Sequence, residues 1–251
     1  MKKLIKKAAN AIATAKNIAA LTGAGISVES GIPPFRGKGG VWERIDPMEY
    51  AHIDALTQNP VKVWKMLMKE MVATVSAAQP NDAHKGLAQL ERQGRLKTII
   101  TQNIDGLHQK AGNTDVIEFH GSFAWLRCMQ CDKRCETDAV DLSVIPPRCE
   151  CGGIYRPDCI FFGEMIPPDD LMRSRQVSSE CDLMLVIGTS ATVQPAALMP
   201  LTAKAAGAVI IEINPEPTPL TEQASDIFLQ GNAGDVMNRI IAVLETDTRT
   251  L

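Results

Sequence analysis

Clustered cysteines are the most distinctive chemical feature of this sequence. The chain holds seven cysteines, and five of them fall between Cys128 and Cys151. Cys128 and Cys131 form one close pair, Cys149 and Cys151 form a second, and two such pairs are typical of a tetrahedral zinc site. Four thiolates leave no open coordination position, so the expected zinc is structural. Cys135 is an alternative ligand, and two unrelated pairs of free thiols are the competing interpretation.

A glycine-rich segment from Gly23 to Ser27 predicts a phosphate site. It follows a segment typical of a strand, where glycines let backbone N–H groups approach a phosphate. A dehydrogenase fingerprint would need a third glycine at position 28, where Val28 stands, and the chain continues as a proline-rich loop over 30–37. The segment therefore indicates a nucleotide but not ordinary hydride transfer. A tight turn without a ligand is the alternative.

Amide and carboxylate side chains follow a second expected strand. Gln102, Asn103 and Asp105 offer hydrogen-bond donors and acceptors where a parallel strand would end, and this predicts a polar ligand there. The alternative is a capped loop in which Asp105 is the N-cap of the next helix.

His120 is a candidate general base because a histidine near its ordinary pKa accepts protons at neutral pH. It comes shortly after the apolar pair Val116 and Ile117. A half-buried structural histidine is the competing interpretation. From spacing alone His52, His84 and His108 are equal candidates.

Strand-like and helix-like segments alternate along the chain, which predicts an α/β fold with a doubly wound parallel sheet. The expected strands are Asn17–Leu21, Lys97–Thr101, Leu183–Ile187, Val209–Ile213 and Asp226–Leu229. The expected helices are Asn81–Gln93, Asp169–Ser179, Pro195–Ala206 and Asp235–Leu244, after an amphipathic first helix with Leu4, Ala8 and Ile12 on one stripe. Ligands of such sheets bind at the carboxyl ends of the strands.

Two segments interrupt this alternation and predict a smaller module. Residues 38–79 have helical character, and residues 121–158 hold the clustered cysteines. We therefore expect a Rossmann-like domain made of 1–37, 80–120 and 159–251, with 38–79 as a helical insertion and 121–158 as a zinc-binding insertion.

The composition is that of an ordinary globular protein. The chain has 251 residues with a net charge of −3, so a basic surface for nucleic acid is not expected. No apolar run approaches the length of a membrane span, which favours a cytoplasmic protein without membrane contact.

The ordered set of motifs resembles the sirtuin family over nearly the whole chain. The motifs are Gly-Ala-Gly-Ile-Ser at 23–27, Ser-Gly-Ile-Pro at 30–33, Phe-Arg-Gly at 35–37, Thr-Gln-Asn-Ile-Asp at 101–105, Phe-His-Gly at 119–121, the cysteine pairs, Phe-Gly-Glu at 162–164 and Gly-Thr-Ser at 188–190. Pro34 departs from the pattern, because the family usually has a polar residue there, and so does the single residue between Cys149 and Cys151.

The resemblance implies an NAD-dependent protein-lysine deacetylase with a Rossmann-like domain and a small zinc module. It implies His120 as catalytic base, with Asn103 also catalytic, and Cys128, Cys131, Cys149 and Cys151 as zinc ligands. It places the acyl-lysine between Ile160 and Phe162. The implied NAD contacts are Gly23, Ala24, Gly25, Phe35, Arg36, Gln102, Asn103, Ile104, Asp105, Gly188, Thr189, Ser190, Asn214 and Ala233.

Two other functions compete with deacylation of protein lysines. An NAD hydrolase or ADP-ribosyltransferase would use the same NAD pocket without an acyl-lysine tunnel. A zinc-ribbon interaction module for nucleic acid would need basic residues around the cysteines, where acidic residues outnumber them.

The acyl group is expected to be uncharged. Family members that prefer acidic acyl groups carry a Tyr and an Arg three residues apart in the helical module, and an ungapped count places Met66 and Lys69 there. The expectation is acetyl first, with propionyl, butyryl or longer chains tolerated. Methionines that only fill a core are the alternative.

Overall fold

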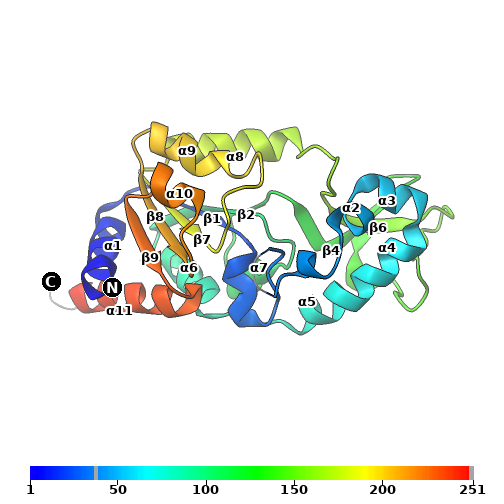
Figure 1. The fold of residues 1–251 in the computed structure, drawn as a ribbon, viewed down its shortest axis with the longest axis horizontal. Coiled ribbons are helices and arrows are strands. Elements are labelled where there is room, and N and C mark those ends of the chain that lie inside the picture. Colours follow the sequence, from blue (N-terminus) through cyan, green and yellow to red (C-terminus); the bar gives the residue numbers. More distant parts are fainter. Residues whose placement is uncertain (37–38, 249–251) are drawn as a thin grey trace.

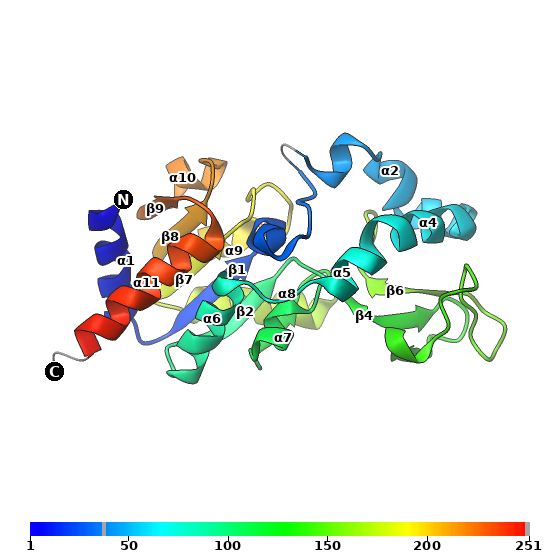
Figure 2. The same ribbon diagram turned by 90° about the horizontal axis from the view of Figure 1, so that it is seen from below.

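A six-stranded parallel sheet forms the larger part of the molecule (Figures 1 and 2), with the strand order β3-β2-β1-β7-β8-β9. The computed structural model describes residues 1–36 and 39–248. The strands are β1 (Ile18–Thr22), β2 (Leu96–Thr101), β3 (Val116–Glu118), β7 (Leu183–Ile187), β8 (Val209–Asn214) and β9 (Ile227–Gln230). This order is that of a dinucleotide-binding doubly wound sheet, and the predicted fold class is confirmed.

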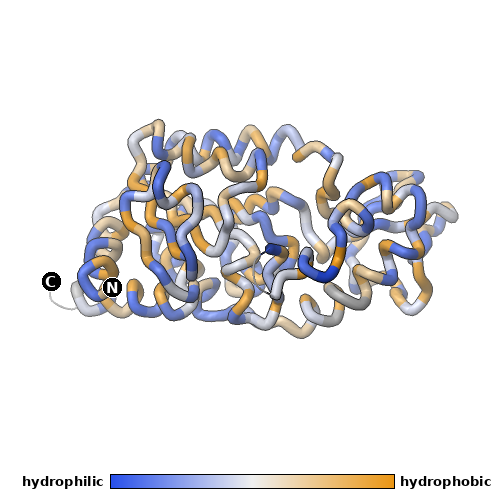
Figure 3. The backbone as a smooth tube through the Cα atoms, viewed as in Figure 1, coloured by the Kyte–Doolittle hydropathy of each residue, from blue (hydrophilic) through white to orange (hydrophobic). Residues whose placement is uncertain are grey.

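Helices cover both faces of this sheet, which explains why its strands are apolar on both sides. The helices α1 (Lys2–Thr14), α6 (Asp82–Arg92) and α11 (Ala233–Thr248) pack on one face, and α8 (Pro168–Glu180), α9 (Leu198–Ala205) and α10 (Pro219–Gln223) cover the other. In β1, Ile18 and Ala20 point into the first apolar cluster, whereas Ala19 and Leu21 point into the second. Apolar residues accordingly recur through the central strands (Figure 3).

Several predicted boundaries need correction. β1 is displaced by one residue from the expected strand, and β3 was not expected as a strand. The helix expected from Pro195 begins at Leu198, because the residues before it form part of an irregular loop that lines a cavity. Leu4 is 40% exposed, and Ile5 takes its place on the buried stripe of α1.

The smaller part combines helices with a three-stranded antiparallel sheet in the order β5-β4-β6. These strands are β4 (Gly121–Cys128), β5 (Arg134–Glu136) and β6 (Tyr155–Cys159), none of which was predicted. The helices are α2 (Pro47–Tyr50), α3 (Ile53–Gln58), α4 (Pro60–Leu67), a π-helix (Met68–Val72) and α5 (Ala73–Ala77). The buried Trp64 of α4 joins the two groups, because its Nε1–H donates to the carbonyl of Tyr155 at 2.9 Å.

The chain leaves the parallel sheet twice to build this smaller part. It first passes from β1 through α2–α5 and returns at α6, and later passes from β3 through β4–β6 and returns at α8 (Figures 1 and 2). The residue limits of a Rossmann-like domain and of the two insertions stay predictions. Within the described residues, every helix is too short or too polar to cross a membrane.

Candidate active site

The point where the strand order reverses lies between β1 and β7, and the loops after these strands meet there. The Gly25 N–H donates to the Gly188 carbonyl at 2.8 Å. Gly188 has φ of 62°, and a Cβ atom on it would lie 2.2 Å from the Ile26 nitrogen. Only glycine allows this approach, which leaves a backbone-lined crevice at the carboxyl ends of the strands.

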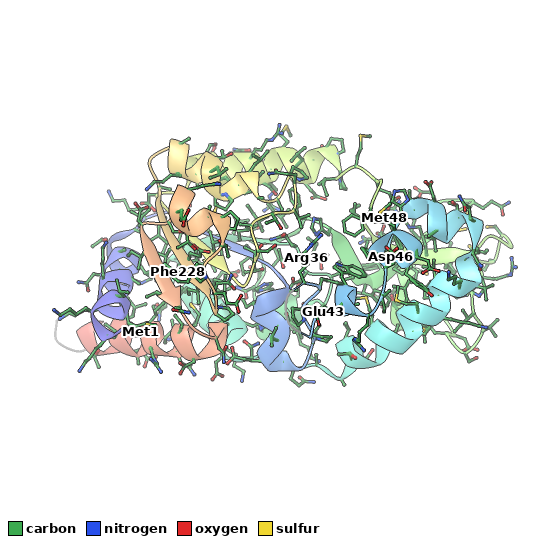
Figure 4. The ribbon with its side chains drawn as sticks, in the orientation of Figure 1. Met1, Arg36, Glu43, Asp46, Met48 and Phe228 are labelled. Carbon is green, nitrogen blue, oxygen red and sulfur yellow. The ribbon has the colours of Figure 1, made fainter. Side chains whose placement is uncertain are left out.

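A cavity of about 1160 Å³ opens from this crevice toward the smaller part. It brings together sixteen of the seventeen predicted catalytic, cofactor and substrate residues: Gly23, Ala24, Gly25, Phe35, Arg36, Gln102, Asn103, Ile104, His120, Ile160, Phe162, Gly188, Thr189, Ser190, Asn214 and Ala233. Figure 4 shows Arg36 in the middle of the molecule, between the edge of the sheet marked by Phe228 and the helices near Met48. Gly37 of the same loop lies outside the described residues.

Asp105 is the predicted residue that does not line the cavity. One carboxylate oxygen accepts from the Ser27 hydroxyl at 2.7 Å, and the other accepts from the Leu107 N–H at 3.0 Å. Asp105 therefore stabilises the start of α7 (Leu107–Ala111), although the N-cap is Gly106. Its contact with a cofactor stays a prediction.

His120 is the histidine of the cavity wall. Its Nδ1 lies 3.0 Å from the carbonyl oxygen of Gln102. Because a carbonyl can only accept, Nδ1 carries the proton and Nε2 keeps the lone pair. Burial lowers the pKa of His120, only partly opposed by this hydrogen bond, so the ring is neutral at pH 7. The geometry leaves Nε2 free to accept a proton.

The other three histidines do not line the cavity. His84 and His108 lie buried as a tilted pair with ring centroids 4.9 Å apart, and among the described residues neither nitrogen of His84 has a hydrogen-bond partner. Burial lowers the pKa of His84 to about 4 and that of His108 to about 3. His52 accepts from the Asp54 N–H at the start of α3.

Ser27 was missed as a site residue. It is fully buried, and its hydroxyl accepts from the Asn103 side-chain amide at 3.1 Å while donating to Asp105. This serine therefore fixes the orientation of Asn103 in the cavity wall. The only sequence signal was its place at the end of the glycine motif.

The wall opposite the sheet comes from the segment after β6. The Ile160 N–H donates to the His120 carbonyl at 2.8 Å, so the two residues are held side by side. Phe162 approaches Trp42, with centroids 6.4 Å apart, and Trp42 stacks on Phe35 at 5.2 Å. Aromatic rings thus connect the loop that carries Arg36 to this second wall.

An ion pair joins β6 to the segment that follows it. The guanidinium of Arg156 donates to both carboxylate oxygens of Glu164 at 2.5 and 2.6 Å and to the Cys159 carbonyl at 2.6 Å. Glu164 also accepts from the Phe161 N–H. Burial alone would raise the pKa of Glu164, but these hydrogen bonds lower it, so the pair stays ionised.

Four cysteine sulfurs converge at the end of the antiparallel sheet. The sulfurs of Cys128, Cys131, Cys149 and Cys151 all lie within 4.8 Å of one another, with Cys128–Cys151 at 3.5 Å and Cys131–Cys149 at 3.8 Å. Thiolates 2.3 Å from a central zinc at tetrahedral angles are about 3.8 Å apart. The four residues are therefore positioned to hold zinc, and Cys135 is not part of the group.

Comparison with known proteins identifies the family. The Sir2 family profile matches residues 23–195. NAD-dependent protein deacylase 1 of Archaeoglobus fulgidus is 48% identical over 237 residues, covering 94% of this chain and 96% of that protein. NAD-dependent protein deacylase of Aquifex aeolicus is 46% identical over 215 residues, covering 84% of this chain and 89% of that protein.

Solved structures agree with this assignment. A Sir2 homologue in complex with NAD has a TM-score of 0.88 and 47% identity, covering 96% of this chain and 94% of its own. A Sir2 protein in complex with a p53 peptide and NAD⁺ has a TM-score of 0.88 and 32% identity, covering 97% of this chain and 99% of its own. The chain belongs to the Sir2 family of NAD-dependent protein deacylases.

Proposed function

We propose that this protein removes acetyl or other uncharged acyl groups from protein lysine side chains, with NAD consumed as co-substrate. The products are nicotinamide, the free lysine and O-acyl-ADP-ribose. The observation that carries the proposal is the position of His120, which lies in one cavity with the glycine loops of the strand crossover on one side and Ile160 on the other.

The glycine loops support the dinucleotide end of the proposed site. Gly23, Gly25 and Gly188 let the two loops pack directly on each other, and the backbone of both loops lines the cavity, where its N–H groups would approach phosphate and ribose. Asn103, oriented by Ser27, would contact the nicotinamide end. Asp105, which accepts from the same Ser27 hydroxyl, is proposed as a further residue of this nicotinamide end.

His120 supplies the proton transfer in the proposed reaction. The acyl oxygen attacks C1′ of the nicotinamide ribose as nicotinamide leaves. His120 Nε2 then takes the proton of a ribose hydroxyl, whose oxygen attacks the acyl carbon. Water completes the transfer and lysine leaves as the amine. The neutral, Nδ1-protonated ring is the form that this role requires.

The expected preference for uncharged acyl groups rests on the wall beyond Ile160. Met66 lines the cavity and offers no hydroxyl group. The side chain of Lys69 lies outside the described residues. Peptides or proteins with acyl-lysine are the proposed partners, and the proposed compartment is the cytoplasm, where thiols stay reduced and available for zinc.

Nicotinamide release tests the proposal. We expect release from NAD to depend on an acetyl-lysine peptide, because the peptide supplies the attacking oxygen. His120→Ala should still bind NAD but lose at least about 10²-fold in deacylation, the usual scale for a missing general base. Peptide-independent release at the full rate would instead identify an NAD hydrolase, and wild-type turnover by the variant would remove His120 from the mechanism.

A further inference from the structure

A buried carboxylate lies behind one end of the cavity wall. Glu212 of β8 is 1% exposed, and it does not line the cavity. Two residues further along the chain, the six residues 214–219 line the cavity without a break. Glu212 is therefore shielded from any ligand in the cavity, but it lies next to a backbone segment that would contact one.

The strand order places the wall 214–219 far from His120. His120 follows β3, whereas Asn214 ends β8, four positions along the order β3-β2-β1-β7-β8-β9. Neighbouring strands are about 4.8 Å apart, so the ends of β3 and β8 are separated by on the order of 19 Å. Because the reacting ribose of NAD lies at His120 in the proposed reaction, the adenosine half of NAD reaches toward 214–219.

The wall 214–219 has few backbone groups that could hold it in place. Every second residue of this wall is a proline, which has no N–H to donate. At its start, the Asn214 carbonyl accepts from the Gly231 N–H, and the Pro215 carbonyl accepts from the Gln230 side chain, both at 3.0 Å. The other end of the wall is held by side chains.

Three hydroxyl groups fix this other end to Glu212. One carboxylate oxygen accepts from the Thr218 hydroxyl at 2.5 Å. The second oxygen accepts from the hydroxyls of Thr221 at 2.8 Å and Ser225 at 2.6 Å. Both threonine oxygens also accept from backbone N–H groups, Thr218 from Leu220 at 3.1 Å and Thr221 from Thr218 at 2.9 Å. The buried carboxylate thus fixes the turn at which α10 begins.

The direction of these hydrogen bonds requires an acceptor at both oxygens of Glu212. The two threonine hydroxyls accept from the backbone, so their own hydrogens are available for the carboxylate. An amide has one acceptor and one donor, so a glutamine at this position leaves at least one hydroxyl without its acceptor. A buried polar group without a partner is costly, and Thr218 can escape this cost only if the cavity wall shifts.

We propose that Glu212 is a positioning residue for NAD, which acts through Thr218 and Thr221 to fix the wall 214–219 against which the adenosine half binds. The inference rests on the proposed function and deepens it, because it assigns one end of that site. Glu212 touches no substrate and takes part in no chemical step. Its loss should therefore weaken the binding of NAD without slowing the reaction of bound NAD.

Calorimetric titration with ADP-ribose tests binding at this end of the cavity, and steady-state deacylation separates KM from kcat. Glu212→Gln should raise the Kd for ADP-ribose and the KM for NAD at least tenfold, equal to about 1.4 kcal/mol. The kcat at saturating NAD and the KM for an acetyl-lysine peptide should change less than twofold. Ser225→Ala keeps the carboxylate and removes one of the three donors, so it should raise both constants about threefold.

Glu91→Gln is the matched control, because Glu91 also accepts three hydrogen bonds. They come from the Asn113 side chain and from the N–H and hydroxyl groups of Thr114, and none of these residues lines the cavity. The Kd for ADP-ribose should equal that of the wild type. An equal rise in Kd in this control would overturn the inference, because general destabilisation would then explain the effect.

The remaining outcomes separate the two proposals. An unchanged Kd in Glu212→Gln overturns the inference, and so does a rise in Kd that comes with an equal fall in kcat, since the whole cavity would then be disturbed. If Glu212→Gln does not fold, an unchanged Kd in Ser225→Ala overturns the inference, and a raised Kd supports it. A wild-type protein that binds ADP-ribose but releases no nicotinamide in response to the peptide overturns only the deacylase function.

Discussion

The parallel sheet and the zinc module meet at one cavity but are stabilised in different ways. The sheet lies between two large apolar clusters that draw on six helices. The antiparallel strands β4–β6 have small clusters, four converging thiols and ion pairs such as Arg127–Asp158 and Arg134–Asp158. Partly exposed ion pairs contribute at most about 1 kcal/mol each. We therefore expect burial to hold the sheet region and zinc to be needed for the other.

Removal of a zinc ligand should produce the largest difference in stability between the two regions. Cys128→Ser removes a buried thiolate, and a structural zinc site contributes on the order of 10 kcal/mol of folding free energy. We expect loss of zinc by elemental analysis, and rapid amide exchange over 121–159, while β7 and β8 stay protected.

Cys135→Ser is the matched control, because Cys135 lies in the same module but outside the group of four sulfurs. It should retain one zinc per chain and the exchange pattern of the wild type. A zinc-free Cys128→Ser protein with protected β4–β6 strands would show that burial alone holds this module.

Acidification should weaken the sheet region through its buried histidines. His84 and His108 have pKa values of about 4 and 3 in the folded protein and about 6.5 when unfolded, so the unfolded chain binds more protons below pH 6.5. Stability is full above pH 6.5 and falls as the pH drops toward 4. The loss between pH 7.5 and pH 5 is on the order of 2 kcal/mol for each histidine.

Urea unfolding at these two pH values measures this effect. His84→Gln cannot titrate, so its stability should change with pH by on the order of 2 kcal/mol less than that of the wild type. Equal pH dependence in the two proteins would exclude His84 as a source of acid sensitivity.

Breaking the ion pair between Arg156 and Glu164, which lies beside Ile160 and Phe162 in the cavity wall, should have the smallest effect of the three changes. Glu164→Gln keeps the shape of the side chain but loses the charge that holds Arg156, so the loop with Ile160 and Phe162 loosens. We expect KM for the acyl peptide to rise about tenfold, equal to about 1.4 kcal/mol, while KM for NAD changes less than twofold.

Glu150→Gln provides the control for this variant. Glu150 pairs with Lys133 at the surface, where its side chain is 85% exposed, and neither KM should change. An unaltered peptide KM in Glu164→Gln would mean that other contacts, such as the hydrogen bond from Ile160 to His120, position this wall without the ion pair.

The sequence was most informative about the sheet region. The apolar run Leu183–Ile187 has the predicted bounds in the structure, because a strand buried on both faces needs little but apolar residues. In the antiparallel sheet, β5 consists of Arg134, Cys135 and Glu136, largely exposed, and its pairing with β4 follows from chain geometry near the thiols rather than from alternation. Periodicity therefore gave no signal for β5, whereas β6 alternates between buried and half-buried residues and could have been found by this pattern.

Several residues of the site could be predicted from their motifs but not from a physical argument about the sequence. Spacing alone could not separate His120 from His84 and His108, because only tertiary structure decides which ring is buried and which faces a cavity. Nor could spacing reveal that Ser27 connects Asn103 to Asp105, since these residues meet through long-range packing.

Each excursion of the chain into the smaller part begins and ends at the parallel sheet, and this affects how the protein recovers from metal loss. A module without a free end remains a pair of closed loops when its own structure is lost. The parallel sheet already holds the two ends of each loop close together. The loss of entropy that accompanies loop closure therefore does not recur when the module refolds. We expect zinc to leave and return as a local event, with the NAD end of the cavity intact throughout.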